Sequence, residues 1–222
     1  MYKKILLCVL LIFSILITGC GKTELSDIET ATLYMNAAYS GDATIAKGTG
    51  LEDEVSAFVY NVDKQMYDVL VYNVLARNGI VYTQDELNRL IQSINKIKEM
   101  TKVEVKYLHS TETYSYARVM ITKVDSKYFT KKAKERLVES LEKDKEELLK
   151  NNARKKDLLR VSMPYLVKSF EETTEEIVND RNFPTEQNDY SITLKYNKIT
   201  KKWDLIDPDE QVKEVVRQSN VS

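Results

Sequence analysis

The chain has 222 residues, 33 basic and 34 acidic, so its formal net charge is −1. A nucleic-acid-binding protein would show a clustered excess of basic residues, which this balance does not provide. Cys8 and Cys20 are the only cysteines, and neither is available for a disulfide if the first is removed with a leader and the second is modified. A chain of this length can still bury enough apolar surface to fold without disulfides.

The N-terminal 19 residues have the pattern of a cleaved leader. Lys3 and Lys4 precede the run Ile5–Ile17, which is apolar apart from Ser14. As a helix these 13 residues would span roughly 20 Å, short of the ~30 Å hydrocarbon core of a bilayer. A secretory signal peptide is therefore a better interpretation than a permanent transmembrane helix.

The leader ends in the tetrad Ile17-Thr18-Gly19-Cys20, which resembles the lipobox of bacterial lipoproteins. The resemblance implies cleavage before Cys20 and a diacylglycerol on its thiol, with further acylation of the new amino group. The alternative is an ordinary signal peptide with a chance cysteine. Two or more acyl chains anchor a protein stably, so we expect this protein on the outer face of a bacterial cell membrane. Loss of Lys3 and Lys4 would leave 31 basic and 34 acidic residues.

Capping boxes mark the start of two helices after the lipidated tether, residues 20–25. Ser26 and Glu29 have the spacing of the first box, and Gly41 can end the helix that follows. Thr83 and Glu86 form the second box, ahead of a strongly amphipathic segment that runs to Ile97.

Between these two helices, apolar residues keep helical spacing from Glu54 to the stop at Asn78-Gly79. Within that stretch, Val69–Val74 is rich enough in β-branched residues to make a strand a minor alternative.

The period then changes to two, which predicts an antiparallel hairpin over Val103–Tyr107 and Ala117–Ile121 with a turn at 110–113. A long charged helix is expected from Thr130 to about Ser162, with a kink or break at Pro164. Its leucines are expected to form an intramolecular core stripe, although they also allow a short heptad seam for a partner helix, interrupted at Asp144 or Lys145. The leucines expected along one side are Leu137, Leu141, Leu148 and Leu158.

A further helix should run to about Val178, with the acidic run 171–176 as a solvated face. A second hairpin follows, over Tyr190–Tyr196 and Trp203–Leu205, and a short helix can begin after Pro208. This order predicts an α+β fold, in which N-terminal helices pack on a curved antiparallel sheet of two hairpins separated by a long helical segment. We expect one domain over 26–222 with a helical insertion at about 130–180.

Two short motifs resemble NTF2-like, or cystatin-like, domains of secreted bacterial lipoproteins. Ala37-Ala38-Tyr39-Ser40-Gly41-Asp42 is similar to the end of the first helix in that superfamily, and Leu194 to Leu205 is similar to its last hairpin. The likeness is nearest to Gram-positive lipoproteins that carry a domain of unknown function. The resemblance implies the fold; the superfamily includes both enzymes and non-catalytic binding domains.

Catalytic and metal-binding patterns are weak. His109 is the only histidine and ends a predicted strand, where a turn residue is favoured over a general base. Glu52, Asp53 and Glu54 could attract Ca²⁺ but lack an EF-hand spacing, and a helix N-terminus explains them equally. The loop Lys47–Gly50 lacks the frame of a phosphate-binding loop. We therefore expect no catalytic residue, no metal and no cofactor.

Tyrosines on the predicted strands could form an aromatic face for a glycan or peptide, although aromatic residues favour strands in any case. They are Tyr107, Tyr114, Tyr116, Tyr190 and Tyr196. The leading hypothesis is a non-catalytic lipoprotein that binds a small ligand, peptide or envelope protein near the membrane. The alternatives are a bacteriocin-immunity-type lipoprotein that sequesters a toxic peptide, and a wall hydrolase using two buried carboxyls of raised pKa.

Overall fold

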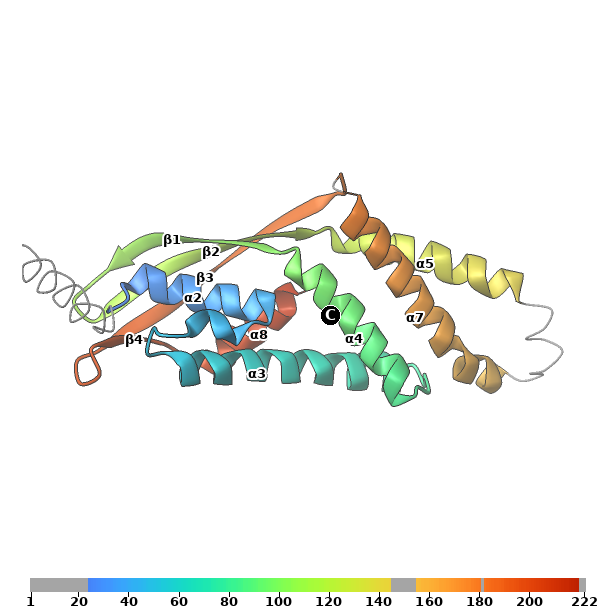
Figure 1. Ribbon diagram of the computed structural model, residues 1–222, viewed down its shortest axis with the longest axis horizontal. Coiled ribbons are helices and arrows are strands. Elements are labelled where there is room, and N and C mark those ends of the chain that lie inside the picture. The colour runs from blue at the N-terminus through green and yellow to red at the C-terminus, as the bar shows by residue number, and fades with distance from the viewer. Residues whose placement is uncertain (1–23, 145–154, 181, 220–222) are drawn as a thin grey trace, which may run out of the picture.

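The computed structural model describes residues 24–144, 155–180 and 182–219, so the leader, the lipobox and Cys20 lie outside the described residues. Figure 1 shows a long antiparallel sheet with helices on one side and a second group of helices at one end. In chain order the elements are α2 (Asp27–Ser40), η2 (Ala43–Ala46), α3 (Glu52–Asp68), η3 (Val69–Ala76), α4 (Gln84–Glu99), β1 (Lys102–Ser110), β2 (Tyr114–Val124), α5 (Ser126–Lys143), α7 (Lys155–Asn179), β3 (Thr185–Asn197), β4 (Lys202–Leu205) and α8 (Pro208–Gln218).

The sheet keeps the order of the chain, β1-β2-β3-β4, and every neighbouring pair is antiparallel. A bulge between Tyr107 and His109 shifts the register of β1 against β2. β2 pairs with β3 along its whole length, from Tyr114 opposite Lys195 to Val124 opposite Thr185. The α+β prediction and both predicted hairpins are therefore confirmed, although β3 starts five residues before Tyr190.

The main core lies between the sheet and helices α2, α3 and α8, which gather on one of its faces (Figure 1). Alternating residues of β2 point inward, and Ala117, Val119 and Ile121 are fully buried. The first helix fits this face because small residues, Ala31, Ala37 and Ala38, let it approach the sheet closely. Tyr39, Tyr190 and Met35 fill the space between α2 and the sheet.

Both predicted capping boxes are confirmed. The Ser26 and Thr83 hydroxyls accept from the backbone of Glu29 and Glu86, whose carboxylates accept from the cap residues in return. Gly41 ends α2 in the left-handed conformation at φ 72°.

A second, smaller core joins η3, α4 and α7. Its fully or nearly buried members are Leu70, Val71, Leu75, Leu87, Leu90, Met163 and Val167. The strand considered for Val69–Val74 is wrong, because these residues form a π-helical segment. Its backbone has i to i−5 bonds from the Arg77 N–H to Tyr72 and from the Ile80 N–H to Leu75.

The helical insertion differs from the prediction at its break point. α5 ends at Lys143, not near Ser162, and α7 runs without interruption through Pro164. Proline in a helix interior costs about 3 kcal/mol. Met163 and Val167 on either side of Pro164 are fully buried against α4, and this packing holds the helix together. Leu137 and Leu141 lie half-buried on α5. The predicted positions of Leu148 and of the Leu158 side chain lie outside the described residues.

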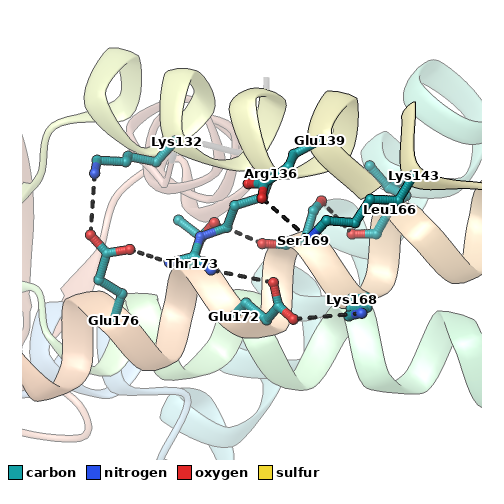
Figure 2. Close-up of polar contacts among 10 residues, drawn as sticks. All are labelled: Lys132, Arg136, Glu139, Lys143, Leu166, Lys168, Ser169, Glu172, Thr173 and Glu176. Atoms are coloured by element: carbon teal, nitrogen blue, oxygen red, sulfur yellow. Dashed lines mark hydrogen bonds and ion pairs between the residues drawn. The ribbon is translucent and has the colours of Figure 1, made fainter. Parts of the chain in front are cut away.

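The acidic run of α7 is partly exposed, but it is not a free solvated face. Figure 2 shows Glu172 and Glu176 facing α5, where Arg136 pairs with both carboxylates and Lys132 lies 3.3 Å from Glu176. On another side of α7, Arg89 of α4 pairs with Glu171. α7 is thus held by ion pairs to both α4 and α5.

Among the described helices, none is both long enough and apolar enough to cross a bilayer.

Candidate functional site

His109 is exposed near the end of β1, and its ring stacks on Tyr116 of β2 with 6.2 Å between centroids. In the described chain, no group of three or more His, Cys, Asp or Glu residues is arranged to hold a metal ion.

The acids at residues 52–54 serve the first turn of α3. Glu52 accepts from the backbone N–H of Gly48 at 2.8 Å, and Glu54 lies 3.8 Å from the Lys202 ammonium. The loop containing Gly48 and Gly50 has positive φ at both glycines and connects η2 to α3. These contacts account for the acids as structural groups that close the loop onto the helix.

The five strand tyrosines do not form one face. Tyr107, Tyr114 and Tyr116 are exposed, whereas Tyr190 and Tyr196 face the core side. The Tyr39 hydroxyl donates to Tyr190 at 3.4 Å, and burial raises the pKa of both phenols. Tyr196 packs on Trp203, with 5.3 Å between ring centroids. The five tyrosines therefore do not make the single aromatic face that was considered for them, and the preference of aromatic residues for strands accounts for their positions.

A mainly apolar groove lies between α3–η3 and α4. We call it the α3–α4 groove. Its volume is about 240 Å³, and its walls are Asp63, Met66, Tyr67, Leu70, Ile91, Ile94 and Asn95. Residues 63, 66, 67 and 70 lie on one stripe of the helix, so α3 and η3 supply one continuous wall. Its apolar residues Met66 and Leu70 belong to the stripe that periodicity assigns to the core, so the sequence alone does not reveal a groove there.

The rim of the groove is polar and aromatic. Asp63, Tyr67 and Asn95 supply its polar groups, and Tyr67 is 39% exposed. The groove lies where α3 passes into the π-helical η3, and such segments are frequent at functional sites. Asp63 is tied to Lys98 of α4 by an ion pair of 2.9 Å, which fixes the two walls relative to each other.

A larger and more polar hollow of about 430 Å³ lies over β1, β2 and β3. It contains Lys102, Glu104, Arg118 and Asp189, of which Arg118 and Asp189 pair. Because its main charges neutralise each other, this hollow offers little to recognise a charged ligand. The α3–α4 groove is the better candidate for binding.

No protein-family model matches the chain, and no curated protein matches it in sequence. Among solved structures, the chain is similar to YcdA, a candidate lipoprotein from Bacillus subtilis subsp. subtilis strain 168, with a TM-score of 0.54 and 13% sequence identity. The match covers 86% of this chain and 54% of that one, so this chain spans about half the length of its structural neighbour. At this identity the similarity shows a shared fold.

Proposed function

We propose that the protein is a non-catalytic lipoprotein, anchored through Cys20 at the outer face of a bacterial cell membrane, that binds a peptide or a segment of an envelope protein in the α3–α4 groove. The leader and its lipobox support the anchor. A fold shared with a candidate lipoprotein of Bacillus subtilis is consistent with it. An NTF2-like or cystatin-like ancestry and a Gram-positive source belong to the same proposal.

The observation that carries the binding role is the groove itself. Pockets for small molecules usually measure about 300–1,000 Å³ and enclose most of the ligand. The α3–α4 groove, at about 240 Å³, is smaller, and the partly exposed Tyr67 lines it. Tyrosine is enriched at the centres of protein interfaces, where a few side chains carry most of the binding energy. The groove therefore suits one or two apolar side chains of a peptide or protein better than a whole small molecule.

The absence of catalysis is part of the proposal. A carboxylate-dependent hydrolase needs an acid whose pKa is raised so that it can donate a proton. The Arg136 hydrogen bond lowers the pKa of Glu176, and hydrogen bonds at the start of α2 lower that of Glu29. Both shifts are opposite to the required direction. The immunity alternative is the special case in which the bound peptide is toxic, and the groove variants below test it as well.

The anchor is tested by fractionating cells that express the full chain or its Cys20→Ser variant, with labelled palmitate. We expect the wild-type protein in the membrane fraction carrying the label, and the variant without label. Mass spectrometry of the mature wild-type protein should show acyl chains on Cys20. An uncut leader, or a bare Cys20 sulfur, would contradict the anchor.

The groove is tested by photo-crosslinking in native membranes from a benzoylphenylalanine placed at Tyr67. The supporting result is a discrete crosslinked product that is lost in the Asn95→Arg variant, whose long side chain covers the groove. Gln92→Arg is the matched control on the same exposed side of α4 and should leave the product unchanged. A crosslinker at Val138, 45% exposed on α5, should give no such product. Equal products from both crosslinking positions, or equal effects of both arginines, would overturn the binding role.

A further inference from the structure

Both hairpin turns meet at one end of the sheet. The β1–β2 turn lies at 111–113 and the β3–β4 turn at 198–201. At this end Tyr114 of β2 is paired with Lys195 of β3, and the Tyr196 N–H donates to the Thr113 carbonyl at 2.8 Å. Figure 1 shows the two turns together, at the end of the molecule opposite α5 and α7. We call this part the hairpin end.

The described chain also begins at the hairpin end. Glu24 and Leu25 line a small hollow together with Lys201, Lys202 and Trp203. Asp27, three residues further on, accepts a hydrogen bond from Ser115 near the start of β2. Cys20 precedes Glu24 by only four residues, which reach at most about 14 Å when fully extended. Any acyl chain on Cys20 therefore holds this end, and not the helical end, against the bilayer.

Apolar side chains project from the hairpin end into solvent. Ile199, within the β3–β4 turn, is 94% exposed, the highest value among the exposed large apolar residues of the described chain. Leu108, at the bulge of β1, and its neighbour Tyr107 are each about half exposed. A turn normally carries polar residues, and an isoleucine there gains nothing from the protein's own core. At a bilayer interface the same side chain would be buried among acyl chains.

The surrounding charge favours an anionic surface. Lys195, Lys198 and Lys201 are exposed on the β3–β4 hairpin, and Lys202 turns inward to the Gly50 carbonyl and Glu54. Lysines beside apolar residues can extend their ammonium groups to lipid phosphates while their stems contact the interface. Glu24 and Glu112 are acids at this end that oppose them, while Asp27, Glu54 and Asp204 are held by Ser115, Lys202 and Asn197.

We propose that the hairpin end is a membrane-contacting surface, in which Ile199 enters the interface of an anionic bilayer and Lys198 and Lys201 contact its headgroups. The proposal rests on the anchor at Cys20. The sheet then stands end-on upon the membrane. In that orientation α5 and α7 lie at the end far from the membrane (Figure 1). The α3–α4 groove, lined by the later part of α3, η3 and α4, then lies away from the hairpin end, where envelope components are accessible.

The test uses the full chain, purified after lipidation and reconstituted into vesicles of phosphatidylglycerol and phosphatidylcholine. Once Cys20 is acylated the mature chain has no free thiol, so Ile199→Cys introduces a unique site for an environment-sensitive fluorophore. We expect a blue-shifted emission at position 199 and severalfold stronger quenching by nitroxide-labelled lipids than at the control site. The control is Tyr72→Cys, 65% exposed on η3 at the opposite end of α3.

A charge-reversed background, Lys198→Glu with Lys201→Glu, should weaken the quenching at position 199, as should pure phosphatidylcholine vesicles or high salt. Mass spectrometry of each sample distinguishes a failure of the Cys20 anchor from a failure of the membrane-contacting surface. A bare Cys20 overturns the anchor and this inference with it. An acylated Cys20 with fluorophores equally unquenched at positions 199 and 72 overturns the membrane-contacting surface and leaves the anchor standing.

Discussion

At the scale of single residues, Lys98 is a buried cation where three helices meet. Its side chain is 4% exposed, and its ammonium pairs with Asp63 of α3, whose side chain is half exposed. The ammonium also lies beside Gly41, at the C-terminal end of α2, where the helix dipole favours positive charge. The pair is therefore asymmetric. The buried Lys98 ammonium needs the Asp63 carboxylate to compensate for its lost hydration, whereas Asp63 remains hydrated by solvent.

This asymmetry predicts the order of two substitutions. Asp63→Ala should lower the free energy of unfolding by about 2 kcal/mol, because it leaves a buried ammonium without its carboxylate. Lys98→Met should cost about 1 kcal/mol or less, because the remaining carboxylate stays hydrated and the methionine fills the space. Urea unfolding of the two variants measures the difference. The reverse order would mean that Asp63, and not Lys98, carries the desolvation cost.

At the scale of elements, Pro164 destabilises α7 locally, and the packing of α7 on α4 compensates for this cost. The residue is exposed within α7, so replacing it removes a clash with the preceding turn and disturbs no core contact. Pro164→Ala should raise the free energy of unfolding by about 1–3 kcal/mol. Lys168→Ala, one turn later on α7 and also exposed, is the matched control and should change it little. An unchanged or lower stability for Pro164→Ala would show that the proline fits an already distorted turn.

The ion pairs between α5 and α7 predict a dependence on acid. Hydrogen bonds from Arg136 lower the pKa of Glu176, so its contribution to stability is complete above the unfolded carboxyl pKa of about 4.3 and is lost as the pH falls through the lower folded value. Because both side chains are about one third exposed, the loss should be near 1 kcal/mol. Glu176→Gln should flatten the pH dependence of unfolding below about pH 5. Glu175→Gln, at an exposed neighbour, should leave it as in wild type.

Local chemistry predicted most elements of this fold, and the failures have physical causes. The capping boxes at Ser26 and Thr83 and the alternating strands were readable because their signals lie within a few residues. The persistence of α7 through Pro164 depends on contacts with α4, which is distant in sequence. The α3–α4 groove is formed by two helices, so its walls look like ordinary core stripes until the helices are brought together.

At the scale of the whole molecule, the two cores should differ in local stability. The core between sheet and α2, α3 and α8 is larger than that of η3, α4 and α7, while α5 is held largely by ion pairs and Phe129 on Phe170. Partially exposed contacts of this kind open more easily than a buried sheet. Hydrogen exchange should therefore show lower protection in α5 and α7 than in β2 and β3. Equal protection throughout would mean that the chain unfolds as one cooperative unit.

The ladder between β2 and β3 has one more consequence. Val124 and Thr185 are neighbours across it, although the entire α5–α7 excursion separates them along the chain. A short loop could join Val124 directly to Thr185 and leave the strand order β1-β2-β3-β4 unchanged. Such a deletion would expose Leu87 and Leu90 to solvent, which should lower the free energy of unfolding by about 2 kcal/mol for each side chain. The α5–α7 segment is therefore not needed for the strand order, but it covers apolar side chains of α4 that would otherwise face water.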